Sequence, residues 1–234
     1  MTAAELDPQI LASMALFQGL PAAALATVAA HARLRHLDRG VRIFGQGDKS
    51  VRAHAVIEGG VRIDQSGSDG AQVVLRFIGP GELFGTLPLF VDGHYPADAV
   101  TLTQTLEASW SEDELLALIH RYPQIGINVI RIIGARLQEV QNRVRELATQ
   151  RAERRVAHAV LRLARQAGLS TLDGTAIEFP LRRKDVADIS GTTLHTASRI
   201  LTGWEKAGLL TTRNRRLTVR KPAELLRIAE EAPD

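Results

Sequence analysis

The sequence predicts an α+β protein in three consecutive parts: a β-sandwich or barrel, one long helix, and a small basic domain. Its 234 residues are 45% hydrophobic and 24% charged, as in a globular protein with a sizeable core. Residues 39–111 hold short β-like runs separated by Gly and Pro turns about every 8–12 residues, which is typical of an all-β domain. After Ser111 the apolar positions recur at helical spacing, and the last third reads as helices followed by a hairpin.

The expected strands follow an opening helical segment and combine β-branched residues with alternating polarity. The predicted strand segments are "VRIF" (41–44), "AHAVIEG" (53–59), "VRID" (61–64), "VVLRFI" (73–78), "ADAVTLTQT" (97–105) and "LEASWS" (106–111). "SGSDG" (66–70) between two of them predicts a hairpin loop, because Gly, Ser and Asp favour tight turns.

A capping box begins the helical part. Ser111 is followed three residues later by Glu114, a pattern that closes a helix N-terminus, and Pro123 ends that helix. The next predicted helix, from about residue 124 to 150, carries apolar residues at alternating spacings of three and four, over nearly three heptads: Ile130, Ile133, Leu137, Val140, Val144 and Leu147. This seam predicts a homodimer; the alternative is that it packs against its own domain.

Charge is unevenly distributed along the chain. Residues 1–149 carry 13 Lys and Arg against 16 Asp and Glu, whereas residues 150–234 carry 16 against 10. A basic C-terminal part indicates a nucleic-acid partner, with a solvated basic surface as the alternative. The chain contains no cysteine, which excludes disulfides, thiolate metal sites and cysteine-ligated iron–sulfur clusters.

The basic part reads as a winged helix-turn-helix. After a helix over residues 152–167 that ends at Gly168, "RKDVADIS" (183–190) is the first helix of the motif and Gly191 supplies the turn. Thr192 or Thr193 caps the second helix, Gly208 follows its end, and "LLTTRNRRLTVR" (209–220) forms a hairpin with a basic tip.

Helical periodicity separates the second helix into two faces. Leu194, Ala197, Ile200 and Leu201 are expected to point into the core. Side chains at i, i+3 and i+4 share the other face and can reach base edges or phosphates together. The predicted DNA contacts are Lys184, Thr193, His195, Thr196, Ser198 and Arg199, with Arg213, Arg215 and Arg216 at the hairpin tip.

The order of β-roll, long helix and winged helix-turn-helix resembles the CRP/FNR family of bacterial transcription regulators over essentially the whole chain. The resemblance implies a cyclic-nucleotide-binding-like jelly roll over residues 1–122, a dimerisation helix and hinge over 123–150, a DNA-binding domain over 151–234, and RNA polymerase as a partner. The family's recognition helix often carries Glu-x-x-Ser-Arg, and here His195 precedes Ser198 and Arg199. Arg199 is thereby implied to read a guanine of a TTG- or TGTGA-like half-site, and the whole operator is expected to be palindromic and similar to TTG-N8-CAA.

The founding member of that family binds cyclic AMP through a Glu and an Arg-Ser pair. In the corresponding stretch "GELFGTLPLFVDGHYPADAV" (81–100), this chain has Thr86 in place of the Glu and Pro96-Ala97 in place of the pair. A buried cyclic phosphate would then lack a compensating cation, which argues against cyclic AMP. The effector pocket is expected to be lined by Gly81, Glu82, Leu83, Phe84, Thr86, Leu87, Tyr95 and Pro96.

"GTTLHTASRIL", "GWEKAGLL" and "YPADA" resemble the DNR/NnrR-like branch, which responds to nitric oxide. This resemblance implies haem as a cofactor, with an axial ligand from this chain. The candidate ligands are the seven histidines, none of which stands out by spacing: His31, His36, His54, His94, His120, His158 and His195. Another small ligand, or none, remains an alternative.

The alternative to a regulator is an enzyme or a pure nucleotide-binding module that uses the β-sandwich. The sequence has no paired carboxylates at constrained spacing, no His-x-His or His-Glu-x-x-His pattern and no P-loop, so we expect no enzyme. The N-terminus lacks a basic signal-peptide region and no apolar run reaches about 18 residues, so we expect a cytoplasmic protein without membrane contact.

Overall fold

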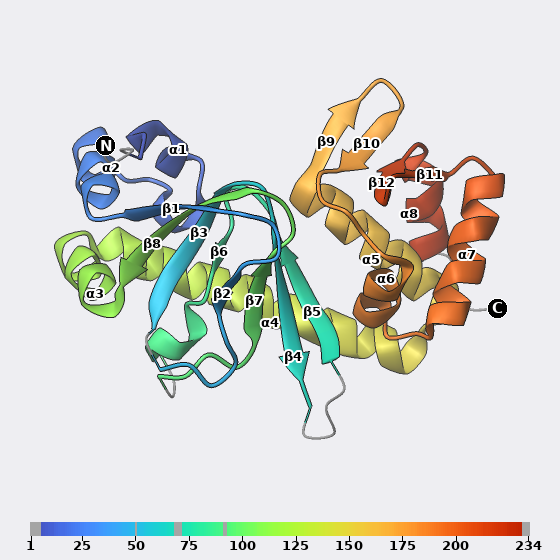
Figure 1. Ribbon diagram of the computed structural model, residues 1–234, viewed down its shortest axis with the longest axis horizontal. Coiled ribbons are helices and arrows are strands. Elements are labelled where there is room, and N and C mark those ends of the chain that lie inside the picture. Colours follow the sequence, from blue (N-terminus) through green and yellow to red (C-terminus); the bar gives the residue numbers. More distant parts are fainter. Residues whose placement is uncertain (1–5, 50, 68–71, 91–92, 231–234) are drawn as a thin grey trace. The chain divides into compact units, whose positions relative to one another are not determined.

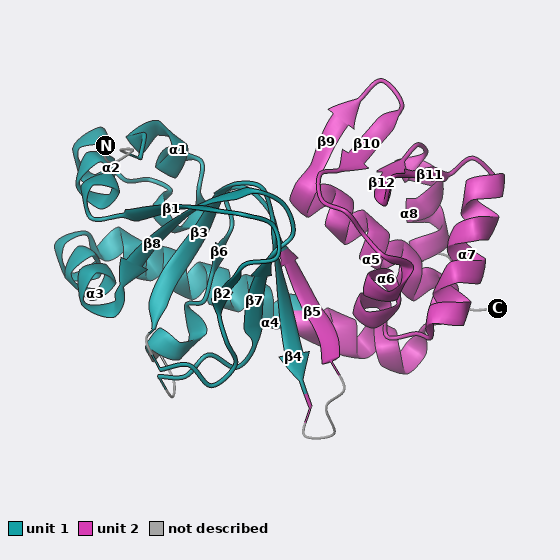
Figure 2. Ribbon diagram, viewed as in Figure 1, with its two compact units in different colours: residues 1–66, 78–139 teal, residues 67–77, 140–234 magenta. Residues whose placement is uncertain are grey.

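The computed structural model describes residues 6–49, 51–67, 72–90 and 93–230 (Figure 1). The chain divides into two compact units, one of residues 1–66 and 78–139 and the other of residues 67–77 and 140–234 (Figure 2). The loop predicted at residues 66–70 lies mostly outside the described residues. Among the described helices, none is both long enough and apolar enough to cross a membrane.

Two four-stranded sheets form the sandwich, as the sequence predicts (Figure 1). One has the strand order β1-β8-β3-β6, comprising β1 (Arg33–Leu37), β8 (Thr105–Ser111), β3 (Arg52–Glu58) and β6 (Leu83–Phe84). The other has the order β2-β7-β4-β5, comprising β2 (Arg42–Phe44), β7 (Asp98–Thr101), β4 (Val61–Ser66) and β5 (Gln72–Ile78). The sequence analysis did not predict β1, which is rich in basic residues. It did not predict β6 either, because that strand is only two residues long.

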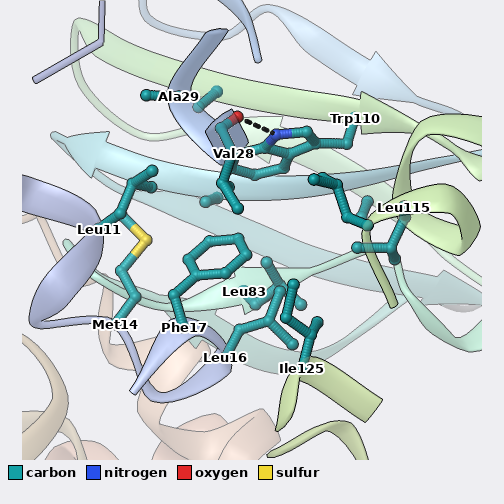
Figure 3. Packing of buried hydrophobic residues seen from close by; sticks show 14 of the residues in the cluster. Leu11, Met14, Leu16, Phe17, Val28, Ala29, Leu83, Trp110, Leu115 and Ile125 are labelled. Atoms are coloured by element: carbon teal, nitrogen blue, oxygen red, sulfur yellow. Dashed lines mark hydrogen bonds between the residues drawn. The ribbon is translucent and has the colours of Figure 1, made fainter. Parts of the chain in front are cut away.

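Helical segments surround the core of the first unit. The elements are α1 (Pro8–Ala12), η1 (Ala15–Phe17), α2 (Ala22–Ala30), η2 (Leu87–Phe90), α3 (Glu112–Arg121) and the first part of α4 (Pro123–Thr149). Trp110 on β8 is fully buried, meets the Phe17 ring edge-on at 5.4 Å and donates its indole N–H to the Val28 carbonyl at 3.0 Å (Figure 3). The indole thereby ties α2 to the sandwich while its only polar atom is satisfied.

The predicted start of α3 is confirmed. The Ser111 hydroxyl accepts from the Glu114 N–H at 3.3 Å, and the Glu114 carboxylate accepts from the Ser111 N–H at 2.6 Å. α3 ends at Arg121, and Pro123 is the first residue of α4, where a missing N–H costs no helical hydrogen bond.

The second unit contains the end of α4 and the elements α5 (Ala152–Ala167), β9 (Gly168–Thr171), β10 (Gly174–Ile177), α6 (Arg183–Ser190), α7 (Leu194–Lys206), β11 (Leu210–Arg213), β12 (Arg216–Val219) and α8 (Pro222–Glu230). Its sheet has the order β11-β12-β10-β9. The hairpin β9–β10 and helix α8 were not predicted. Gly168 caps α5 as expected, but its φ of −95° is extended and not left-handed, because the residue directly begins β9.

Part of β5 belongs to this second unit. The Phe77 ring lies parallel to the Phe179 ring, with 4.9 Å between centroids, and both side chains are buried. The Arg143 guanidinium on α4 donates to the Leu75 carbonyl at 3.2 Å. The second unit therefore has a core that includes an aromatic pair from residues distant in sequence.

Candidate nucleic-acid interface and effector region

A glycine turn joins α6 to α7. Gly191 has φ 61° and ψ 42°, a left-handed conformation that side chains disfavour, and its N–H closes the end of α6. Thr193 caps α7, its hydroxyl accepting from the Thr196 N–H at 3.1 Å. The predicted helices, turn and cap are all found in the structure.

The buried face of α7 differs from the prediction at one residue. Ala197 and Leu201 are buried as expected, and Ile200 is half-buried. The prediction that Leu194 is buried was wrong, because its side chain is 51% exposed. Leu194 is the first residue of the helix and precedes the first buried position by almost one turn, so it lies beyond the packed core.

The opposite face of α7 presents polar side chains to solvent. His195 and Arg199 are exposed, and Ser198 is half-buried. Arg183 on α6 holds the helix pair together: its guanidinium donates to the Ser198 carbonyl at 3.0 Å and to the Glu205 carboxylate at 2.9 Å. Thr193 is exposed and Thr196 half-buried, so the predicted α7 residues share a solvent-accessible end of the helix.

Lys184 is exposed on α6, and its ammonium lies 2.9 Å from both carboxylate oxygens of Asp188. This exposed i,i+4 pair is weak in water, so a phosphate could compete for the ammonium. Its predicted DNA contact remains a prediction.

The hairpin of β11 and β12 forms the wing. Arg213 pairs with Arg216, and Asn214 and Arg215 between them have φ of 50° and 63°. Two successive positive φ values are typical of a two-residue hairpin turn whose twist matches the right-handed twist of the flanking strands. The three arginines predicted at the tip, Arg213, Arg215 and Arg216, are exposed there.

A shallow groove of about 560 Å³ lies on the sheet of the second unit. Its lining residues are Asp173, Ala176, Thr211, Arg213, Asn214, Arg216, Thr218 and Arg220. Three arginines against one aspartate make the groove cationic. The sequence analysis did not name Arg220, which directly follows β12 and lines the groove together with Arg216.

The eight residues predicted to line the effector pocket lie in different environments, and their role in binding an effector stays a prediction. Phe84 and Tyr95 belong to the sandwich core, and Tyr95 stacks on Phe44 with 3.7 Å between ring centroids. Leu83 is buried in a different cluster, because neighbouring residues of β6 point to opposite sides. Leu87 and Pro96 are exposed, and Gly81, Glu82 and Thr86 are half-buried.

A buried polar network crosses the sandwich beside Tyr95. His54 is 3% exposed; its Nδ1 donates to the Glu107 carboxylate and its Nε2 lies 3.1 Å from the Tyr95 hydroxyl. That hydroxyl has a single proton, which it can donate either to Nε2 of His54 or to the Arg52 carbonyl at 2.9 Å, and Arg35 donates to Glu107 at 2.8 Å. All of these hydrogen bonds are made between residues of the sandwich.

Burial is the main cause that lowers the pKa of His54 below its ordinary value, against the opposing effect of Glu107. Burial opposes ionisation of Glu107 as well, but the hydrogen bonds from His54 and Arg35 outweigh it and lower the pKa of that carboxyl. The network therefore holds an ionised carboxylate and a neutral imidazole at neutral pH.

The seven histidines differ in their burial and hydrogen bonding. Both ring nitrogens of His54 are already engaged, and His158 is half-buried on α5. The other five are exposed: His31, His36, His94, His120 and His195. Across the described ranges, no three His, Cys, Asp or Glu side chains are grouped so that they could hold a metal ion.

Residues 34–122 match the cyclic nucleotide-binding domain family, and residues 154–228 match the Crp-like helix-turn-helix domain family. The chain is 32% identical to the cyclic AMP receptor protein of Thermus thermophilus over 214 residues, which cover 92% of this chain and 96% of that protein. This chain belongs to the CRP/FNR family of transcription regulators.

Other members of the CRP/FNR family share its length and fold. The CRP-like cAMP-activated global transcriptional regulator of Mycobacterium tuberculosis is 27% identical over 86% of this chain and 89% of its own length. The crystal structure of Thermus thermophilus catabolite activator protein matches with a TM-score of 0.54 at 32% identity, covering 92% of this chain and 98% of that one. FixK2 from Bradyrhizobium japonicum has the same fold, with a TM-score of 0.74 at 22% identity over 86% and 99% of the two chains. The predicted fold class is confirmed, and relatives in this family are transcription regulators rather than enzymes.

The His54 network predicts a pH-dependent stability of the sandwich. Because the folded state keeps His54 neutral, the unfolded chain takes up more protons below about pH 6.5, and stability falls as the pH decreases through that value. Thermal unfolding between about pH 5 and 7.5 is expected to show a smaller decrease in melting temperature for His54→Gln than for the wild-type chain. His36→Gln, at an exposed position, serves as the control. Equal pH slopes in all three proteins would contradict a neutral buried His54.

Proposed function

We propose that this chain is a homodimeric, sequence-specific regulator that binds a pseudo-palindromic operator through α7 and receives an effector in its N-terminal domain. The observation that carries the proposal is the exposed N-terminal half of α7, set against α6 by a left-handed glycine and flanked by an arginine-bearing wing. The chain's membership of a family of helix-turn-helix regulators supports this proposal.

Base reading is assigned to three side chains of α7. His195, Ser198 and Arg199 lie at i, i+3 and i+4, so they share one face of the helix. An arginine fork matches O6 and N7 of guanine, while His and Ser each exchange single hydrogen bonds with a base or phosphate. By resemblance, Arg199 reads a guanine of a TTG-N8-CAA-like operator. His195 replaces the usual Glu, so the base opposite it is expected to differ.

Dimerisation is assigned to α4. The six seam residues are exposed large apolar side chains in the single chain, from 46% for Leu147 to 71% for Ile130. The alternative, in which the seam packs against its own domain, does not account for this exposure. Pairing two such helices would bury the stripe and supply two recognition helices, which meet successive major grooves about 34 Å apart.

The effector is proposed to be a small ligand other than cyclic AMP, although two relatives are named for cyclic AMP. At the positions that the resemblance assigns to nucleotide contacts, the chain has Thr86, Pro96 and Ala97, which offer no cation to a phosphate. RNA polymerase is proposed as a partner on family resemblance alone.

A response to nitric oxide through haem is part of this proposal, on family resemblance alone. The visible spectrum of protein produced with haem supplied is expected to show a stoichiometric Soret band that moves on anaerobic addition of nitric oxide. Each histidine would then be substituted in turn to find the axial ligand. Protein without haem would instead be screened with small organic ligands.

Arg199→Ala is expected to weaken binding to an operator selected from a randomised duplex pool by about 1–3 kcal/mol and to relax selection at one base pair. The measurement is a mobility-shift titration on the selected duplex and on its scrambled version. Arg227→Ala, an exposed change on α8, is the control. An equal loss on both duplexes would mean that Arg199 contacts only phosphate.

Leu137→Asp is expected to produce monomers, because a carboxylate in the middle of the seam would be buried unpaired in the dimer. Light scattering of the purified variant checks its mass. Leu226→Asp on α8 alters a comparably exposed leucine outside the seam and should keep the wild-type mass. A dimer mass for Leu137→Asp would remove the seam as the dimer contact.

A further inference from the structure

We propose that Arg155 is the positioning residue that fixes the direction of the recognition helix relative to the end of α4. The inference rests on the proposed function, since it concerns how a dimer sets the distance between its two recognition helices. Arg155 lies in the first turn of α5 and is half-buried. Its role follows from which atoms its guanidinium contacts.

One guanidinium donates to three carbonyls in two separate segments. Nη1 donates to the Gln150 carbonyl at 2.7 Å, at the junction between α4 and α5. Nε and Nη2 donate to the Ser190 and Gly191 carbonyls, both at 3.0 Å, where α6 ends and the turn begins. Carbonyls at helix ends carry partial negative charge and lack helical partners, so a rigid cationic fork suits them.

The turn also packs directly against α4. A Cβ atom added to Gly191 would lie 2.3 Å from Cδ2 of Leu147, closer than any tolerated contact. That atom is the end of a flexible and partly exposed side chain, so the left-handed φ is what requires glycine at position 191. The close approach shows that the turn lies directly against the last turns of α4.

Two further arginines extend the connection on either side. Arg162 on α5 donates from Nη1 to both carboxylate oxygens of Glu146 on α4, at 2.9 and 3.0 Å, and Glu146 is buried. Arg183 joins α6 to the Ser198 carbonyl of α7. Contacts therefore run from α4 through Arg155 to the turn and on to α7, so a rotation of α4 turns α7 with it.

Arg155→Lys would keep the positive charge but remove the planar guanidinium with its several N–H donors. A single ammonium is a compact donor and cannot span three carbonyls that a planar guanidinium reaches at fixed geometry. Arg155→Lys is therefore the informative variant. Arg154→Lys is its matched control, because Arg154 is the neighbouring residue on the same helix and donates to the Ala229 carbonyl of α8 at 3.1 Å.

The experiment measures how strictly the dimer requires one half-site spacing. Full-length protein is titrated with the selected operator and with duplexes whose half-sites are one base pair closer or further apart. Wild type and Arg154→Lys are expected to discriminate strongly against altered spacing. Arg155→Lys should reduce that discrimination by a factor on the order of ten, as expected for lost hydrogen bonds to a charged donor.

A second measurement tests whether Arg155→Lys changes only the turn or weakens the fold as a whole. Amide hydrogen exchange without DNA should be faster at residues 190–193 in Arg155→Lys alone, with melting temperature and dimer mass close to those of Arg154→Lys. Unchanged spacing discrimination with unchanged exchange would overturn the role of Arg155. A global loss of protection in Arg155→Lys would overturn it too, by showing a general stabilising residue. Failure of the wild-type chain to select any duplex would instead refute the proposed function itself.

Discussion

Helix α4 imposes the constraint on which the rest of the structure depends, because one helix must serve two different environments. Near its start, Ile125 and Val129 are buried in the core of the first unit, and the Asn128 side chain donates to the Leu16 and Gln18 carbonyls at 2.9 Å. From Ile130 onward its apolar stripe is exposed. Monomeric proteins rarely expose such a stripe to water, and this exposure is what supports the proposed pairing of α4 with a second copy.

Guanidinium–carbonyl contacts add to the apolar packing of the second unit. Arg155 and Arg183 donate to carbonyls at the turn and on α7. Small domains bury a limited apolar area, so directional hydrogen bonds contribute more to the relative placement of their helices. Such contacts suit a regulator in which the direction of one helix decides which spacing of half-sites is bound.

The first unit combines an aromatic core with a buried ionised network. Phe44, Phe84 and Tyr95 fill the region that resemblance assigns to the effector, and His54 and Glu107 lie beside them. A ligand entering this region would displace stacked rings or the hydroxyl shared between Tyr95 and His54.

Local signals in the sequence determined the helix boundaries, the capping box at Ser111, the turn at Gly191, the cap at Thr193 and the wing. Each depends on residues a few positions apart, so the chain itself carries the information. The tertiary structure decided the exposure of Leu194, the core position of Tyr95, the short strands β1, β6, β9 and β10, and the three carbonyls that Arg155 contacts. These depend on neighbours 35 or more positions away in several cases, as between Arg155 and Ser190, and no pattern of spacing along one helix or strand records such a neighbour.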